Sequence, residues 1–561
     1  MSLQFIFGNS GSGKSHYLYQ QIVEESIRHP EKNYLVLVPE QFTMQTQKDL
    51  CMTHPRGGIM NIDVLSFGRL AHRVFEETGK ERQPILDDEG KNLVLRKIAG
   101  NYEDELTVLK GNLKKQGYIS EVKSVISEFT QYGIDFEQLD SFMEGLNPES
   151  YLYYKLKDIR KVYEGFEDYL RDKYITKEEL LDVLSQNVPE AKMLKDSVIA
   201  MDGFTGFTPV QNRLIGELLK VCDKIMLTVE IDRREDPFVY KHPYQLFALS
   251  KQMVTSLTEV AQEVRVEIDE PVWLCKNPSY RFKENPEMAF LEEELFRYSR
   301  RKYSGEKMRS ISLHEVHTPQ EEAQYVAEEI RRLVREEGYR YREIAVIASD
   351  LSTYADALEK ACDRYEIPVF MDHKKSILLN SFVEYLRSLL VMVEQNYTYE
   401  SVFRYLRTSL CGFTRDEVDR LENYCLALDL KGFKKWDQVW VRKTPMTTKE
   451  ELEELNHLRM HFVEKLTPLH TVLKKRKKTV KEITLAVYEY LVQEKIQEQL
   501  AELEQKFQED GELALAKEYA QIYRIVLELF DKFVELLGEE EIPLKEYCEL
   551  LDAGLEEAKV G

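Results

Sequence analysis

The first fifteen residues hold the feature that most constrains how this chain can fold. A short apolar segment at residues 5–7 runs directly into the pattern Gly-x-x-x-x-Gly-Lys-Ser at residues 8–15. This spacing is typical of a P-loop, in which a glycine-rich turn between a strand and a helix turns backbone N–H groups toward phosphate oxygens. The alternative is an ordinary glycine-rich turn. The residues expected to bind nucleotide are Gly8, Asn9, Ser10, Gly11, Ser12, Gly13, Lys14 and Ser15.

Two of these residues would carry the ligand chemistry. Lys14 is expected to reach the β- and γ-phosphates, and the helix that begins near it adds its positive end. Ser15 places a hydroxyl where a phosphate-bound Mg²⁺ needs an oxygen ligand. The pattern therefore predicts ATP and Mg²⁺ as ligands.

Composition narrows the class of protein. A chain of 561 residues is too long for one core, and a net charge of -22 confines any contact with DNA to local basic patches. The seven cysteines lack C-x-x-C spacing, so neither a zinc site nor a disulfide framework is expected. We find no signal peptide and no apolar run of membrane-spanning length, which favours a cytoplasmic protein without membrane contact.

The first 290 residues predict a parallel α/β sheet interrupted by helices. Residues 34–38 form a continuous apolar run that ends at Pro39, typical of a buried parallel strand, and residues 62–67 are a further strand candidate. A long helical pattern follows from about residue 87 to 184. The strand pattern returns at residues 197–202 and ends on Asp202, which we interpret as the carboxylate on the Mg²⁺ side of the site. A lone aspartate at a strand end is more often a cap or turn residue.

The segment that begins at Asp202 resembles a motif of a known helicase family. Residues 202–211 match the box D-E-F-Q-D-T-x-x-x-Q of UvrD-like superfamily 1 helicases at Asp202, Phe204 and Gln211. Other similar segments are residues 64–70, 321–330 and 341–347. Within that group, V-P-E-Q-F-T, L-S-F-G-R-L and D-G-F-T-G-F-T-P most resemble the B subunits of bacterial AddAB helicase-nucleases. The resemblance implies two RecA-like P-loop domains with parallel sheets, each with a large all-helical insertion, and adds Gln211 to the nucleotide-binding residues.

The resemblance also implies domain ranges. The first RecA-like domain is expected at residues 1–85 and 190–290, its helical insertion at 86–189, the start of the second RecA-like domain at 291–385, and the second helical insertion at 386–561. Within the second half, residues 311–313, 344–347 and 369–370 are expected to be strands, residues 355–362 a helix, and residues from 383 onward helical.

Three departures from the helicase pattern predict a degenerate motor. Gly203 stands where active helicases have the glutamate that deprotonates the attacking water, and a hydrogen atom cannot act as a general base. Residues 227–232 contain no glutamine to sense phosphate, and Ala348 replaces an expected arginine.

Two basic segments are candidate DNA contacts. The alternative is that the first segment is a solvated linker between domains and the second a solvated helix junction, which is the more common role of such charged runs. Their residues are Arg300, Arg301 and Lys302, and Lys474, Lys475, Arg476, Lys477 and Lys478.

The resemblance implies a helicase-like subunit of an ATP-dependent helicase and exonuclease complex that acts on double-strand DNA ends in recombinational repair. The implied partners are DNA and an AddA-type motor and nuclease subunit, in a heterodimer. The family's nuclease carboxylates and iron-sulfur cysteines are not found in this sequence, which is expected to be an amino-terminal fragment, so no catalytic residue is assigned. The alternatives are a working superfamily 1 translocase and an unrelated P-loop kinase.

Overall fold

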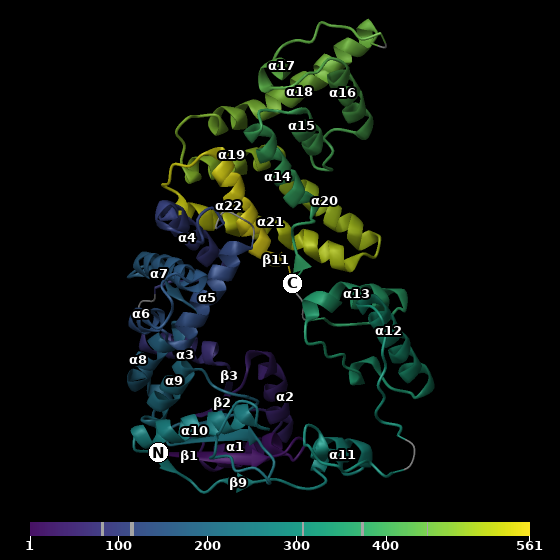
Figure 1. Ribbon diagram of the computed structural model, residues 1–561. Coiled ribbons are helices and arrows are strands. Elements are labelled where there is room, and N and C mark those ends of the chain that lie inside the picture. Colours follow the sequence, from purple (N-terminus) through teal and green to yellow (C-terminus); the bar gives the residue numbers. More distant parts are fainter. Residues whose placement is uncertain (80–82, 113–116, 306–307, 372–374, 446, 561) are drawn as a thin grey trace. The chain divides into compact units, whose positions relative to one another are not determined.

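The computed structural model describes residues 1–79, 83–112, 117–305, 308–371, 375–445 and 447–560. The chain forms two compact units (Figure 1). One comprises Met1–Asp87 and Glu121–His314, and the other comprises Asp88–Ser120 and Glu315–Gly561. The fold is mixed α/β, as the sequence predicts.

A parallel sheet forms the centre of the first unit. Its strand order is β3-β2-β6-β7-β1-β8, and β9 also pairs with β1. The strands are β1 (Ser2–Gly8), β2 (Tyr34–Leu37), β3 (Ile62–Leu65), β6 (Val198–Met201), β7 (Lys224–Glu230), β8 (Glu267–Ile268) and β9 (Val272–Trp273). All of β2 and β6 is buried, which explains why these segments are continuously apolar instead of alternating.

The strand register brings the two motifs that are predicted to bind nucleotide to one edge of the sheet. Gly8 of β1 lies opposite Glu230 of β7, and Met201 of β6 lies opposite Leu227 of the same strand. Because the strands are parallel, their carboxyl ends meet at one edge, where open α/β sheets bind their ligands. Asp202 follows Met201 directly and therefore lies on the same edge as the P-loop.

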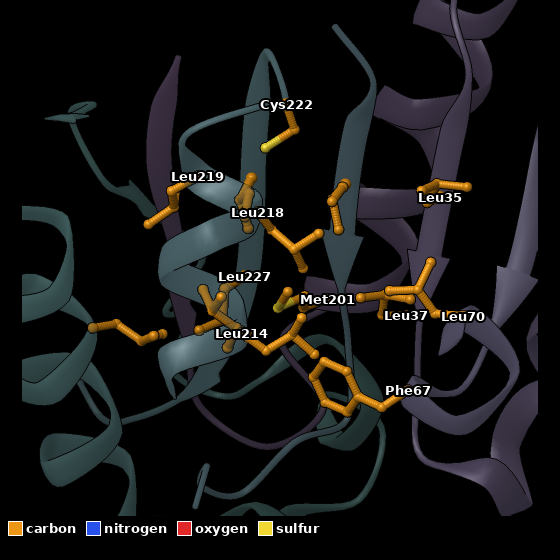
Figure 2. Close-up of a cluster of buried hydrophobic side chains, with 14 of the residues drawn as sticks. Leu35, Leu37, Phe67, Leu70, Met201, Leu214, Leu218, Leu219, Cys222 and Leu227 are labelled. Carbon is orange, nitrogen blue, oxygen red and sulfur yellow. The ribbon is translucent and has the colours of Figure 1, made fainter. Parts of the chain in front are cut away.

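Helices cover both faces of this sheet (Figure 1). On one face, α1 (Lys14–Arg28) and α2 (Thr43–Thr53) contribute Leu18, Ile22 and Leu50 to a buried cluster with strand residues. The other face holds a larger cluster, in which Leu214 and Leu218 of α9 lie with Met201 and Leu227 of the sheet (Figure 2). Its helices are α3 (Phe67–Thr78), α8 (Leu180–Asn187), α9 (Pro209–Leu219) and α10 (Ala248–Glu263). The sheet that carries the P-loop is therefore packed on both faces.

The remaining elements of the first unit are mostly helical, as expected. They are β4 (Ile85–Leu86) and β5 (Ile175–Thr176), which pair in parallel, α5 (Tyr118–Tyr132), which begins in the other unit, α6 (Phe136–Glu144), α7 (Tyr151–Leu170) and α11 (Pro286–Glu294). No helix among the described residues is both long enough and apolar enough to cross a membrane.

Helix α4 (Asp88–Asn101) belongs to the second unit although its sequence lies inside the first expected insertion. It lies beside α21 (Leu513–Leu537) and α22 (Leu544–Glu557), and Figure 1 shows α4 next to α22. Arg96 donates to the side chain of Glu549 at 3.1 Å, and Lys532 pairs with Glu89. The helical segment expected at residues 86–189 is thus divided between the two units.

The rest of the second unit is mostly helical. From residue 383 onward the predicted helical pattern is confirmed, apart from the two-residue strand at Lys559–Val560. Its other elements are α12 (Pro319–Glu336), α13 (Leu351–Arg364), β10 (Lys375–Ser376), α14 (Ser381–Glu394), α15 (Tyr399–Leu406), α16 (Arg415–Ala427), α17 (Phe433–Asp437), α18 (Lys449–Leu473), α19 (Val480–Gln493), α20 (Ile496–Glu509) and β11 (Lys559–Val560). Strands β10 and β11 pair antiparallel.

The strands predicted at residues 311–313, 344–347 and 369–370 are not formed. Helices α12 and α13 pack together around Ala327 and Cys362. None of the three apolar segments has a strand partner among the described residues. The side chains of Leu313, Ile347 and Phe370 are 97%, 95% and 91% exposed. An apolar run becomes a strand only where a neighbouring strand satisfies its N–H and C=O groups, and sequence pattern alone does not supply that neighbour.

Candidate nucleotide-binding site

The strand, loop and helix predicted for the P-loop are all present. Strand β1 ends at Gly8 and α1 begins at Lys14, with Gly13 as its N-terminal cap. Gly11 has a φ of +71°, and a Cβ atom there would lie 2.6 Å from Cβ of Arg281. Only glycine fits this left-handed and crowded position. The loop is therefore shaped by its glycines, as the motif requires.

Lys14 lies over the loop and toward the pocket. Its Nζ donates a hydrogen bond to the carbonyl oxygen of Asn9 at 3.0 Å. Burial lowers the pKa of the Lys14 ammonium, while the nearby carboxylates of Glu230 and Asp202 oppose that shift. This cation, partly removed from water at the mouth of the loop, is suited to bind phosphate.

Asp202 is held by two hydroxyl groups from different elements. Its Oδ2 accepts a hydrogen bond from the hydroxyl of Tyr19 on α1 at 2.8 Å, and its Oδ1 accepts one from the hydroxyl of Thr228 on β7 at 2.5 Å. Asp202 is only 7% exposed. Burial, together with the charge of Asp202, raises the pKa of the Tyr19 hydroxyl, so Tyr19 remains a donor at neutral pH.

These residues line one cavity at the carboxyl edge of the sheet. Its volume is about 630 Å³, which lies within the usual range for a small-molecule site. Its lining residues are Ser10, Gly11, Lys14, Ser15, Asp202, Gly203, Phe204, Thr205, Thr228, Glu230, Gln245, Phe247, Ala248, Leu249, Ser250 and Arg281. Predicted phosphate-binding and metal-binding residues are thus brought together.

The donor set fits Mg²⁺ bound with a nucleotide. The Ser15 hydroxyl and the Asp202 carboxylate face the same cavity, and Mg²⁺ typically takes one or two carboxylates while phosphates and water complete its shell. Among the described residues, no group of three or more histidine, cysteine, aspartate or glutamate side chains could hold a metal ion by itself. The nucleotide phosphates would therefore have to supply part of the coordination.

The loop also carries buried polar atoms without protein partners. The Asn9 amide donates to both carboxylate oxygens of Glu292 at 3.1 Å, whereas its own Oδ1 has no partner. The hydroxyl oxygens of Ser12 and Ser279 are also buried and unpartnered. Buried polar groups normally make hydrogen bonds, so these three atoms are exceptions in the region of the loop.

Sequence reasoning missed several residues of the cavity, including Arg281 and Gln245. Arg281 lines it, and the Arg281 backbone N–H donates to the carbonyl oxygen of Gly11 at 3.1 Å. Gln245 also lines the cavity, although its side-chain oxygen accepts the backbone N–H groups of Lys241 and His242 at 2.6 and 3.1 Å. The glutamine sought at residues 227–232 was a signal that could have led to Gln245, but no local pattern marks Arg281.

Gln211 has a structural partner outside the cavity. It is the third residue of α9, where its side-chain oxygen accepts the backbone N–H of Thr208 at 2.9 Å. The Thr208 hydroxyl accepts the Gln211 N–H in return, which completes a capping box. Its role as a nucleotide ligand stays a prediction.

The two basic segments differ in how many of their cationic side chains form ion pairs or hydrogen bonds within the protein. Arg300 and Lys302 are exposed, whereas Arg301 pairs with Glu293 at 2.9 Å and with Glu294 at 2.6 Å. In the second segment, Lys477 pairs with Glu541 at 3.7 Å, and buried Lys478 donates to the carbonyl of Lys475 at 2.9 Å. The exposed members of this second segment are Lys474, Lys475, Arg476 and Lys477.

Comparison with known proteins decides the family. Residues 5–292 match the family described as ADDB, N-terminal, and residues 282–557 match the UvrD-like helicase C-terminal domain. This chain belongs to the AddB family. The AddB resemblance predicted from the motifs is confirmed, and membership argues against the unrelated P-loop kinase.

Curated AddB relatives are similar along the whole chain. The B subunit of the ATP-dependent helicase/deoxyribonuclease of Lachnoclostridium phytofermentans is 41% identical over 567 residues, which cover 100% of this chain and 49% of that protein. Proteins of the same name from Clostridium novyi and Acetivibrio thermocellus are each 32% identical, again over 100% of this chain, and the matches cover 48% and 49% of those proteins. The chain spans about half the length of these AddB relatives.

Proposed function

We propose that this chain is the nucleotide-binding, helicase-like part of an AddB-type subunit. In this proposal the subunit works with an AddA-type motor and nuclease subunit in a heterodimer that processes double-strand DNA ends for recombinational repair. The relatives are named as B subunits of an ATP-dependent helicase/deoxyribonuclease, which supports this role. The observation that carries it is the cavity shared by Lys14, Ser15, Asp202 and Arg281.

Each of these residues has a specific task in binding ATP. The backbone N–H groups of the P-loop and the Lys14 ammonium bind phosphate oxygens, and Arg281 adds a second cation at the same cavity. Ser15 and Asp202 hold Mg²⁺, which when bound neutralises phosphate charge. The four residues come from the P-loop and from two distant segments, so binding depends on the folded sheet edge as a whole.

We further propose that the motor is degenerate. Gly203 follows Asp202 at the position where a glutamate would activate water, and it lines the cavity without any side chain. A general base typically contributes about 10²- to 10⁴-fold to a rate. ATP binding would then persist while hydrolysis is slow. Nuclease activity and the iron-sulfur cluster of the complex are proposed to reside outside residues 1–561.

One observation favours the alternative of a working translocase. Glu230 ends β7, is exposed and lines the cavity, so it could replace the missing base. Two other carboxylates near the sheet edge, Asp232 and Glu40, are less well placed to act as the base. Asp232 is paired with Arg234 at 2.5 Å and with Arg297 at 2.9 Å, and Glu40 is not among the lining residues.

Equilibrium binding and turnover measured side by side test the proposal. Wild type should bind a labelled ATP analogue, and Lys14→Ala should abolish that binding because it removes the principal phosphate partner. DNA-stimulated turnover should stay below about one per second, the low end of ordinary enzymes. Faster turnover that is lost in both Lys14→Ala and Glu230→Gln would replace the degenerate motor with the working translocase.

A further inference from the structure

Tyr19 makes a contact that neither the P-loop motif nor the helicase motifs assign. It lies four residues after Ser15 on α1, so both hydroxyl-bearing residues occupy one face of the helix. The Tyr19 hydroxyl donates to Oδ2 of Asp202 at 2.8 Å and lies 3.3 Å from the hydroxyl of Thr46. Tyr19 is 7% exposed, so this contact is shielded from bulk water.

The contact fixes a carboxylate that would otherwise be costly to bury. An ionised carboxylate out of water needs hydrogen-bond donors, and here each oxygen has one: Tyr19 on Oδ2 and Thr228 on Oδ1. The donors come from α1, which packs on one face of the sheet, and from β7, which pairs with β6, the strand that precedes Asp202. Each carboxylate oxygen can accept more than one hydrogen bond, so lone pairs remain for a metal ion or its water.

We propose that Tyr19 is a positioning residue for Mg²⁺-dependent nucleotide binding and acts through Asp202. Its hydroxyl links the helix that follows the P-loop to the acidic residue at the end of β6, so Ser15 and Asp202 keep one relative position before the ligand arrives. This inference rests on the proposed nucleotide-binding function. A purely structural hydrogen bond would stabilise the fold equally whether or not Mg²⁺ is present.

Nucleotide affinity measured with and without Mg²⁺ separates these roles. The dissociation constant of a fluorescent ATP analogue is measured for the full 561-residue chain in excess Mg²⁺ and in EDTA. Tyr19→Phe keeps the ring and removes the hydroxyl. We expect the affinity in Mg²⁺ to fall roughly tenfold, the scale of one lost hydrogen bond to a charged group, and the affinity in EDTA to change little.

Three further variants make the test specific. Tyr34→Phe removes a hydroxyl from another buried tyrosine of the same core cluster, outside the cavity, and should leave both affinities unchanged. In an Asp202→Asn background, Tyr19→Phe should have no additional Mg²⁺-dependent effect, because its route to the metal is gone. Thr228→Val removes the other donor and should also reduce the Mg²⁺-dependent part of the affinity. If thermal unfolding shows that Tyr19→Phe does not fold, Thr228→Val provides the test instead.

The possible failures are distinguishable. No binding of nucleotide by folded wild type would overturn the proposed function and this inference together. Three results would overturn the role of Tyr19 alone while wild type still binds. They are equal losses in Mg²⁺ and EDTA for Tyr19→Phe, unchanged or tighter binding by that variant in Mg²⁺, and a full effect in the Asp202→Asn background.

Discussion

Gly203, where the proposed degenerate motor lacks its general base, has a backbone conformation that disfavours any side chain. Its φ is +76°, a left-handed conformation that costs a residue with a side chain about 1–2 kcal/mol. A Cβ atom there would lie 3.6 Å from the ring of Phe42, which is ordinary contact. The obstacle to a glutamate at this position is therefore the backbone and not a lack of space.

We predict that Gly203→Glu does not restore an active motor. The strained backbone would displace the new carboxylate, so turnover should remain below about one per second, and the free energy of unfolding should fall by about 1 kcal/mol. Urea unfolding and steady-state ATP turnover measure the two effects. Gly206→Glu is the matched control, because Gly206 has no positive φ and a Cβ atom there would have no neighbour within 4 Å, and it should unfold like wild type. Rapid DNA-stimulated turnover in Gly203→Glu would contradict the argument.

At the scale of the element, α9 begins with a capping box that accounts for Gln211. The side chain of Gln211 and the hydroxyl of Thr208 each accept a backbone N–H from the other residue, which satisfies two donors at the start of the helix. The same residue that aligns with a helicase motif thus has a complete structural explanation in this fold. The two roles make different predictions.

We predict that Gln211→Ala lowers the free energy of unfolding by about 0.5–1 kcal/mol, the usual size of a lost cap. Nucleotide affinity should change by less than about twofold, which corresponds to under about half a kcal/mol. Thr208→Ala removes the other half of the capping box. It should match Gln211→Ala in both the free energy of unfolding and the nucleotide affinity. Chemical denaturation and analogue binding provide the comparison. A large loss of affinity in Gln211→Ala, absent from Thr208→Ala, would instead support the predicted nucleotide ligand.

For the whole molecule, charge limits how DNA can be bound. The net charge is -22, so any DNA contact depends on a few local cations and should weaken steeply as salt rises. The exposed cluster at Lys474, Lys475 and Arg476 is better suited to this than the segment in which Arg301 pairs with Glu293 and Glu294.

We predict that changing Lys474, Lys475 and Arg476 to glutamate weakens single-stranded DNA binding more than the same change at Arg300, Arg301 and Lys302. Each lost phosphate contact should also reduce the salt slope of the binding constant by about 0.7. Fluorescence anisotropy at several salt concentrations measures both quantities, and nucleotide binding serves as the folding control. Equal affinity in all three proteins would identify both segments as solvated surface.

The P-loop could be predicted from sequence because its determinants are contiguous. Gly8, Gly11, Gly13, Lys14 and Ser15 specify a strand, a turn and a helix through local backbone conformation, and the structure has all three. The buried parallel strands were also predictable, because burial on both faces imposes continuous apolar runs. The resemblance to the AddB family could also be found from short motifs, because the residues of each motif are contiguous in the chain.

Other features depended on residues that are distant in the chain. Tyr19, Thr228 and Arg281 reach the candidate nucleotide site only because α1, β7 and the short helical turn at Tyr280–Phe282 meet at one sheet edge. Their side chains follow no local pattern. Helix α4 joins α21 and α22 because the surface that it buries lies against those helices. The apolar segment that includes Ile347 did not become a strand because backbone pairing is a property of two segments. Sequence by itself determined the local shapes and the phosphate loop; only the tertiary structure decided which distant side chains surround it, because those contacts are set by packing and hydrogen bonding across the fold.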